Sequence, residues 1–402
     1  MINNYRLIYV GIIFATMLDS FAIGILLPIL PFILIDFGAN AFWVGALMSV
    51  QFIGGALGSV ILGKLADNIP RGILLLISLC TIALGNWALL WVNSLIALFV
   101  IRGVVGFMSS NLVVFESIVT GISTDEDRSI GLARLRIGST MGLILGPAFA
   151  TAMGTLNLIN NRTDMLIVIA IISSLIPFIV LFTFKGEVNK IHISQRKKSP
   201  HINIFKTFLT NSKIRDFSLI KMLIAICFGL LVGVVPVWSK KELGWTSTEI
   251  SNLILIFGLS LLSIQIFIAL GKAKWLNSLA SLSGACFIVL PGFAFAILFP
   301  SGASLFILSC LIGLSSAIVN ITIPSTISKI SYGYVGAMLG LMATVVLIGS
   351  TIGPMFFGFI YDYFGYSWSL FCGFICAAYA TYLSVKYLRT NEIANSNTQE
   401  QA

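Results

Sequence analysis

The sequence predicts an all-α integral membrane protein with twelve transmembrane helices, arranged as two pseudo-symmetric halves of six. Three observations support this fold class. First, the 402 residues are 58% hydrophobic and 10% charged, with a mean hydropathy of +1.01. Soluble domains carry about 25% charged residues, so lipid must surround most of this chain. Second, the apolar residues form long runs, unlike the alternating segments of about ten residues in a β-barrel. Third, two motifs recur at nearly the same spacing.

The first half of the chain contains six apolar stretches of about 20 residues or more, enough to cross the hydrocarbon core. The first stretch is longer than the apolar region of a signal peptide, about 7–15 residues, and no small-x-small cleavage site closes it. We therefore expect a retained first span. The six stretches are 7–34, 43–62, 73–92, 95–121, 131–153 and 163–184.

The second half repeats this plan after a basic linker. Its stretches are 216–238, 248–270, 276–299, 302–325, 335–360 and 367–388. The expected domains are an N-terminal six-helix half (1–184), a cytoplasmic linker (185–215), a C-terminal six-helix half (216–388) and a polar cytoplasmic tail (389–402).

Two motifs indicate that the halves are duplicated. The sequence GLILGP at 142–147 recurs as GSTIGP at 349–354, 207 residues later. Gly-Lys at 63–64 recurs at 271–272, 208 residues later. Many secondary transporters are built from such repeats, with the substrate site between the repeats near the middle of the membrane.

The distribution of basic residues predicts the orientation. With the N-terminus in the cytoplasm, nineteen of the 24 Lys and Arg residues fall on the cytoplasmic side, three fall outside and two lie within spans. This asymmetry follows the positive-inside rule. We expect a multi-pass protein of the inner (plasma) membrane with both termini cytoplasmic.

The sequence lacks the residues that several other classes of protein require. The net charge of +9 is explained by membrane topology, so no nucleic-acid partner is expected. The six cysteines lie in apolar runs and suit helix packing rather than disulfides or metal ligands. The sequence contains no phosphate-binding loop for an ATP-driven pump and no nucleophile beside a base for an enzyme. No cofactor is expected.

Charges inside the membrane are the most informative residues, because each costs about 2.5–3.5 kcal/mol at mid-bilayer. At a rise of ~1.5 Å per residue, Asp19 and Arg102 lie at similar depths. We expect an Asp19–Arg102 pair, or an exchange in which Arg102 holds Asp19 when it is deprotonated. The pair could carry proton coupling, or it could be a static link between two helices.

Glu116 lies nearer the cytoplasmic end of the same span as Arg102. The two are fourteen residues apart, so they share a helix face. Glu116 is a candidate second protonation site or contact for a cationic substrate. Alternatively, it is the ion-pair partner of Arg134 or Arg136.

Four segments in order resemble the major facilitator superfamily, specifically its twelve-helix drug/proton antiporter branch, which includes tetracycline/proton antiporters and multidrug exporters. They are Leu18–Pro31, Gly63–Arg71, Arg102–Gly106 and Gly142–Pro147. The resemblance implies proton-coupling roles for Asp19 and Arg102, and gating roles for the following residues: Gly63, Asp67, Arg71, Gly142, Gly146, Pro147, Gly353 and Pro354. Two alternatives stay open: Asp67 could simply cap the third span, and the glycines of the fifth span, spaced by four, predict a close helix approach that packing alone could explain. Tetracycline antiporters carry an acidic residue in the third helix, where this chain has Asn86, so tetracycline itself is disfavoured.

The predicted function is secondary active transport: export of a small organic molecule, either drug-like or an endogenous metabolite such as a siderophore, in exchange for protons. The alternatives are a proton symporter that imports a small polar solute and a non-transporting membrane sensor. Candidate substrate-cavity residues are Asn111, Phe228, Trp238, Gln265 and Asn320. The expected partners are the lipid bilayer, protons and the small-molecule substrate, and the protein is expected to be monomeric.

Overall fold

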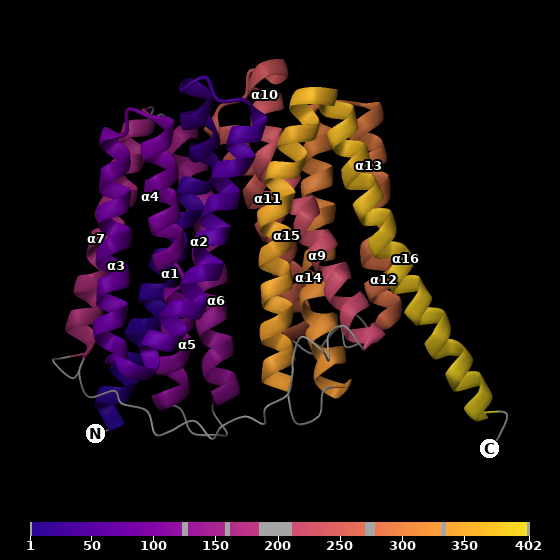
Figure 1. The fold of residues 1–402 in the computed structure, drawn as a ribbon, viewed down its shortest axis with the longest axis horizontal. Helices are drawn as coiled ribbons and strands as arrows, with labels where there is room; N and C mark the ends of the chain where they lie inside the picture. Colours follow the sequence, from indigo (N-terminus) through magenta and orange to yellow (C-terminus); the bar gives the residue numbers. More distant parts are fainter. Residues whose placement is uncertain are drawn as a thin grey trace. The chain divides into compact units, whose positions relative to one another are not determined.

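The computed structural model describes residues 2–122, 128–156, 161–184, 211–269, 278–330 and 335–399, and every regular element within these ranges is a helix (Figure 1). In the first part of the chain these are α1 (Ile2–Asp36), α2 (Ala41–Asn68), α3 (Arg71–Ala88) with a 3₁₀ turn η1 (Leu89–Trp91), α4 (Leu95–Met108), α5 (Asn111–Ile122), α6 (Arg128–Thr155) and α7 (Arg162–Phe184).

The second part contains α9 (Ser212–Gly233), α10 (Val235–Leu243), α11 (Ser247–Ala269), α12 (Leu279–Phe287), α13 (Val289–Leu298), α14 (Gly302–Ile330), α15 (Val335–Phe364) and α16 (Tyr366–Gln399). Together the described helices form twelve candidate membrane spans. The predicted number of spans is therefore confirmed.

Three of the predicted spans are interrupted helices. The fourth span divides into α4 and α5 at Ser109 and Ser110. Both serine hydroxyls donate to carbonyl groups, Ser109 to Val105 at 2.8 Å and Ser110 to Gly55 at 2.6 Å. These side chains supply hydrogen bonds to backbone carbonyls beside a break inside the membrane, where water is not available to do so.

Prolines explain the other two interruptions. Proline lacks an N–H group, and its ring clashes with the carbonyl of the residue four positions earlier. Pro236 lies just after the junction of α9 and α10, and Pro291 just after that of α12 and α13. Each break falls within the turn that precedes its proline.

The chain divides into two compact units. Unit 1 comprises Met1–Ala39, Val50–Lys197 and Trp245–Leu255, and unit 2 comprises Asn40–Ser49, Lys198–Gly244 and Ile256–Ala402. The start of α2 thus belongs to unit 2. There the carboxylate of Asp362 on α15 accepts hydrogen bonds from the backbone N–H groups of Ala41 at 3.1 Å and Phe42 at 2.8 Å. A carboxylate suits a helix N-terminus because it satisfies free N–H groups and interacts favourably with the helix dipole.

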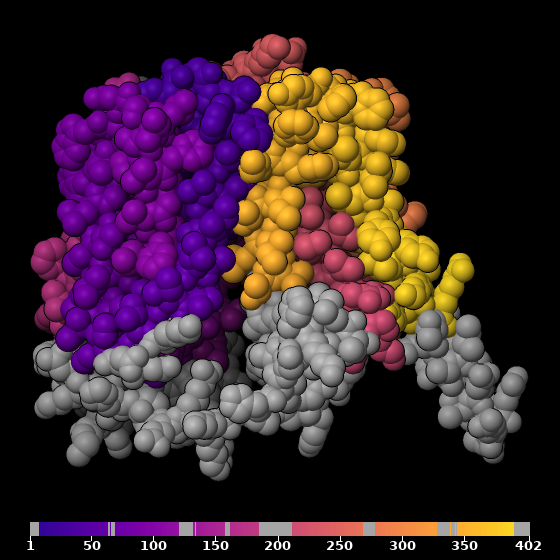
Figure 2. Space-filling model, in the orientation of Figure 1, coloured from indigo at the N-terminus to yellow at the C-terminus, as the bar shows by residue number. Residues whose placement is uncertain are grey.

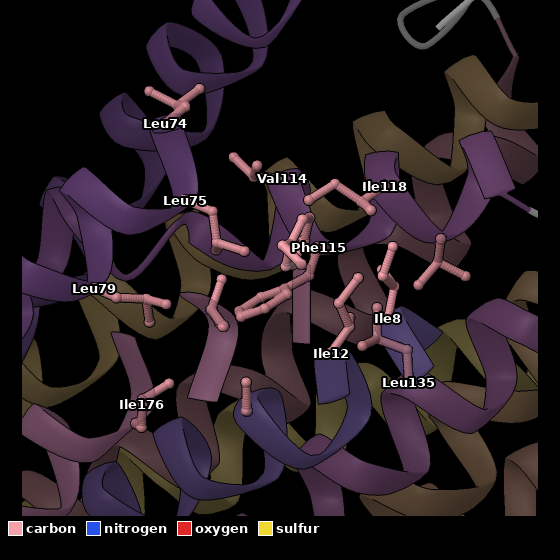
Figure 3. Close-up of a cluster of buried hydrophobic side chains, with 14 of the residues drawn as sticks. Ile8, Ile12, Leu74, Leu75, Leu79, Val114, Phe115, Ile118, Leu135 and Ile176 are labelled. Carbon is pink, nitrogen blue, oxygen red and sulfur yellow. The ribbon is translucent and has the colours of Figure 1, made fainter. Parts of the chain in front are cut away.

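In unit 1, a core of aliphatic side chains surrounds Phe115 of α5 (Figure 3). Ile8 and Ile12 of α1, and Leu75 and Leu79 of α3, belong to this cluster and are at most 2% exposed. The core fixes α1, α3 and α5 against one another, and these helices carry Asp19, Asn86 and Asn111 respectively.

Glycines allow α6 to lie directly on α1. A Cβ atom added to Gly146 would lie 2.5 Å from the carbonyl oxygen of Phe21, so a larger residue would force the helices apart. In unit 2, a Cβ on Gly353 of α15 would lie 2.8 Å from the carbonyl oxygen of Ile226 on α9. The close approach predicted from the glycine spacing is therefore present, and the same packing recurs in both units.

The outer surfaces of the units are apolar. Figure 2 shows α15 and α16, in orange and yellow, along one face of unit 2. On α16, Phe371, Ile375 and Tyr382 are 44%, 51% and 64% exposed. Side chains of this kind would destabilise a water-facing surface but suit lipid, and the protein is accordingly a multi-pass membrane protein.

Candidate functional site

Asp19 is a buried acid in the middle of α1, with only 6% of the residue exposed. Its Oδ2 accepts a long hydrogen bond, 3.5 Å, from Asn111 Nδ2. Asn111 is the first residue of α5, directly after the break that ends α4. The interrupted span thus places an amide beside the acid.

Arg102 of α4 is a buried cation, 2% exposed. Its Nη2 donates a hydrogen bond to Gln51 Oε1 on α2, whereas its Nε has no hydrogen-bond partner among the described residues. The two helices are close because of Gly106, where a Cβ would lie 2.5 Å from the carbonyl oxygen of Gln51. Local packing therefore brings the amide of Gln51 to the guanidinium.

Asn86 of α3 supplies a third buried polar side chain, 4% exposed. Its Nδ2 donates to Ser173 Oγ on α7 at 2.8 Å, and its Oδ1 has no partner among the described residues. Asn86 was not predicted as a site residue. An amide within an apolar span was the available signal, because such groups need a hydrogen-bond partner in lipid.

These side chains line one small cavity in unit 1, with a volume of about 10 Å³. Its polar lining comes from Asp19, Gln51, Asn86, Arg102 and Ser109, and its apolar lining from Ala22, Ile23, Leu26, Ile82 and Val105. The arrangement brings a buried acid, a buried cation and amide groups to one cavity, a combination typical of sites with perturbed proton affinity. No group of three or more His, Cys, Asp or Glu that could hold a metal occurs in the described part of the chain.

Asp19 and Arg102 lie beside the same cavity, but no ion pair within 4.0 Å joins them in the described structure. The expected direct pair is absent from this conformation. Each side chain instead bonds to a neutral amide, Asn111 or Gln51. Asp19 is therefore free to gain or lose a proton without breaking a salt bridge.

Glu116 lies apart from this cavity. It forms an ion pair with Arg136 of α6 at 2.8 Å, in which the glutamate side chain is 27% exposed and the arginine side chain 70%. Of the two alternatives open from the sequence, this geometry matches a partnership with Arg136.

Part of the predicted gate lies outside the described side chains, namely Gly63 and Asp67 near the end of α2. Arg71, at the start of α3, donates from Nη1 to the carbonyl of Ser117 on α5 at 2.8 Å. Of the remaining gate residues, Gly142, Gly146 and Pro147 are in α6, whereas Gly353 and Pro354 are in α15. The first three lie where α6 packs on α1, and the last two lie where α15 packs on α9.

The predicted substrate-cavity residues belong to both units. Asn111 contacts Asp19 in unit 1, as described above. In unit 2, the Phe228 ring packs on Phe257 with centroids 4.6 Å apart, and Trp238 stacks on Tyr366 at 4.0 Å. Gln265 of α11 is half-buried, and Asn320 of α14 is exposed.

The acid, the Gln51 amide and the cation of this cluster do not recur at the corresponding positions of unit 2. Gly146 of α6 lies against the carbonyl of Phe21, and the equivalent Gly353 of α15 lies against that of Ile226, so Phe21 and Ile226 occupy equivalent positions. Asp19, two residues before Phe21, is then equivalent to Ile224. Likewise, Gly106 lies against the carbonyl of Gln51 and Gly313 against that of Phe257, so Gln51 is equivalent to Phe257. Ser309, four residues before Gly313, then matches Arg102, four residues before Gly106. In unit 2 an aliphatic residue, an aromatic residue and a serine replace the acid, the amide and the cation.

Known proteins resemble this chain along most of its length. Tetracycline resistance protein, class B, of Escherichia coli is 25% identical and covers 96% of this chain and 97% of its own. Staphylopine export protein of Staphylococcus aureus is 24% identical over 62% of this chain and 64% of its own.

Solved structures share the fold at lower identity. A bacterial homolog of the human lysosomal transporter Spinster has a TM-score of 0.78 at 16% identity, covering 96% of this chain and 98% of its own. The nucleoside transporter NupG has a TM-score of 0.74 at 17% identity, covering 95% and 98%. The family model for the Major Facilitator Superfamily matches residues 12–344. The chain therefore belongs to the Major Facilitator Superfamily and is a membrane transporter.

Proposed function

We propose that the protein is a proton-driven exporter, which moves a small organic molecule out of the cytoplasm in exchange for protons by alternating access. The observation that carries this proposal is the buried carboxylate of Asp19 beside a polar cavity. An ionisable group at such a depth costs about 2.5–3.5 kcal/mol, which is why such groups usually serve transport or pair with another charge. Asp19 has no ion-pair partner within the described structure.

Exchange follows from competition at Asp19. The ionised carboxylate favours a cationic group of the cargo or the approach of Arg102, whereas a proton neutralises the acid and removes both attractions. A proton loaded from outside thus favours release of the cargo there. A symporter would instead need proton and cargo bound together, so the direction of coupled flow separates the two mechanisms.

The cargo is proposed to be a drug-like compound or an endogenous metabolite such as a siderophore. Relatives named for tetracycline resistance and for staphylopine export support export of a small organic molecule. Asn86 stands where an acid would be expected in a tetracycline antiporter, so tetracycline itself is the weaker candidate. We further propose that the protein acts as a monomer in the inner membrane, with both termini in the cytoplasm.

Proton flux in inside-out vesicles tests this function. Vesicles containing the protein are acidified inside, candidate solutes are added outside, and a pH-sensitive dye reports proton efflux. We expect a transported solute to dissipate the gradient with wild type but not with Asp19→Asn, which removes the acid with little change in shape. Undiminished exchange by Asp19→Asn would exclude Asp19 as the coupling group. Dissipation by no solute in a broad library would contradict proton-driven export.

A further inference from the structure

Two polar atoms in the unit 1 cavity lack hydrogen-bond partners in the described structure: Nε of Arg102, a donor, and Oδ1 of Asn86, an acceptor. The residues are 2% and 4% exposed, so bulk water does not reach them. Both side chains line the same cavity. A buried group without a partner costs about 1–3 kcal/mol, and most buried polar groups in proteins have one.

The cavity has room for one small molecule. Its volume is about 10 Å³, and about 10–15 Å³ by this measure is enough for one water. The chemistry of the lining narrows the choice further. The molecule must accept a hydrogen bond from Arg102 Nε and donate one to Asn86 Oδ1. A metal cation cannot accept from the guanidinium, and a simple anion cannot donate to the amide oxygen.

We propose that this cavity holds one bound water molecule, which accepts from Arg102 Nε, donates to Asn86 Oδ1 and makes its remaining contact with the carboxylate of Asp19. A buried water usually makes two to four hydrogen bonds, about three on average. This site offers three polar partners from α1, α3 and α4. Both unpaired atoms are then satisfied.

The water also connects the acid to the cation without a salt bridge. When Asp19 is ionised, the water donates its second hydrogen to the carboxylate. When Asp19 is protonated, its O–H group donates to the water, which still accepts from Arg102 and donates to Asn86. The water therefore keeps hydrogen bonds to all three side chains in both protonation states. This consequence for coupling rests on the proposed function, whereas the presence of the water does not.

Radiolytic hydroxyl-radical footprinting, read by mass spectrometry, tests the water directly. Radicals formed from a bound water label the side chains beside it, even where bulk water is excluded. Ile82 lines the cavity and is 3% exposed. Leu79, one turn earlier on α3, is 1% exposed and lies in the aliphatic core around Phe115. The experiment uses the purified full chain in nanodiscs without any added solute.

We expect Ile82 to be labelled several-fold faster than Leu79 in wild type. Asn86→Leu, which removes the acceptor, should lower the Ile82 rate to that of Leu79. Ser173→Ala is the matched control, because it removes the partner of Asn86 outside the cavity lining and should leave Ile82 labelling intact. Equal labelling of Ile82 and Leu79 in wild type would overturn the proposal, whatever the folding of the variants. If Ile82 were labelled but the protein exchanged no protons in the vesicle assay, the bound water would be supported and the proposed function refuted.

Discussion

Arg102 depends on Gln51, because burial of its guanidinium at 2% exposure is costly unless its N–H groups are hydrogen-bonded, and Gln51 accepts from Nη2. We expect Gln51→Leu to destabilise the protein by about 1–3 kcal/mol, since it leaves Nη2 without its acceptor. Adding Arg102→Leu should recover stability, because the double variant no longer buries an unpaired cation. Thermal unfolding in detergent measures both. A double variant that is destabilised by the sum of the two single effects would show that the contact is not coupled.

Glu116 provides the contrasting residue, because its ion pair with Arg136 is partly exposed. Such surface pairs contribute about 0–1 kcal/mol. We expect Glu116→Gln to change the melting temperature little and to retain proton exchange in the vesicle assay, unlike Asp19→Asn. Loss of exchange in Glu116→Gln at normal stability would instead identify Glu116 as a second protonation site.

The sequence predicts the depth of a charged residue in the membrane better than it predicts the hydrogen-bond partner of that residue. A helical rise places Asp19 and Arg102 at one level, and both do line one cavity. Their actual hydrogen bonds depend on rotation about the helix axes and on the break after α4, which brings Asn111 to Asp19. Because hydropathy contains no information on rotation, Gln51, Asn111 and Asn86 could be recognised as polar residues within spans but not assigned to partners.

At the scale of helices, the packing of α6 on α1 makes a specific demand at Gly142. A Cβ there would lie 2.0 Å from the carbonyl oxygen of Met17 and 2.9 Å from the backbone nitrogen of Phe21. These are backbone atoms that cannot move aside independently of their helix. We expect Gly142→Ala to lower the free energy of unfolding by about 1–3 kcal/mol, the typical cost of overpacking. The yield of folded protein and its melting temperature should both fall.

Gly284 of α12 is the matched control, because a Cβ there would meet no atom within 4 Å. Alanine is favoured over glycine within a helix by about 0.5–1 kcal/mol, so Gly284→Ala should be neutral or slightly stabilising. If both variants melted alike, the effect at Gly142 would reflect general helix propensity rather than the contact with α1.

Hydropathy located all twelve spans but missed the interruptions within them. A span is recognised from the average over about 20 residues, and replacing one or two residues hardly changes that average. Pro236 and Pro291 did carry a signal for a break. The break at Ser109 and Ser110 depends instead on a carbonyl of α2 that receives the Ser110 hydroxyl, which is a tertiary contact absent from local sequence.

For the molecule as a whole, the two units share their helix packing but differ in the ionisable residues of the cavity. The glycine contacts of α6 on α1 recur for α15 on α9, so both units keep one packing scheme. The ionisable groups of the cavity do not recur, because Ile224 and Ser309 occupy the positions of Asp19 and Arg102. Packing constrains the glycines in both units, whereas a single buried acid suffices to bind a proton. We therefore expect proton coupling to depend on unit 1 substitutions more strongly than on their unit 2 equivalents.

The orientation of the whole chain can be tested across a single span, Ser212–Leu243. Ser212 and Glu242 are exposed near its two ends. In a variant with all six native cysteines replaced, we expect Glu242→Cys to react with a membrane-impermeant maleimide in intact bacterial cells. Ser212→Cys should react only after the membrane is permeabilised. The span is a stringent choice, because Lys240 and Lys241 lie at its proposed outer end, against the overall bias of basic residues toward the cytoplasm. The reverse labelling pattern would place both termini outside and invert the proposed direction of transport.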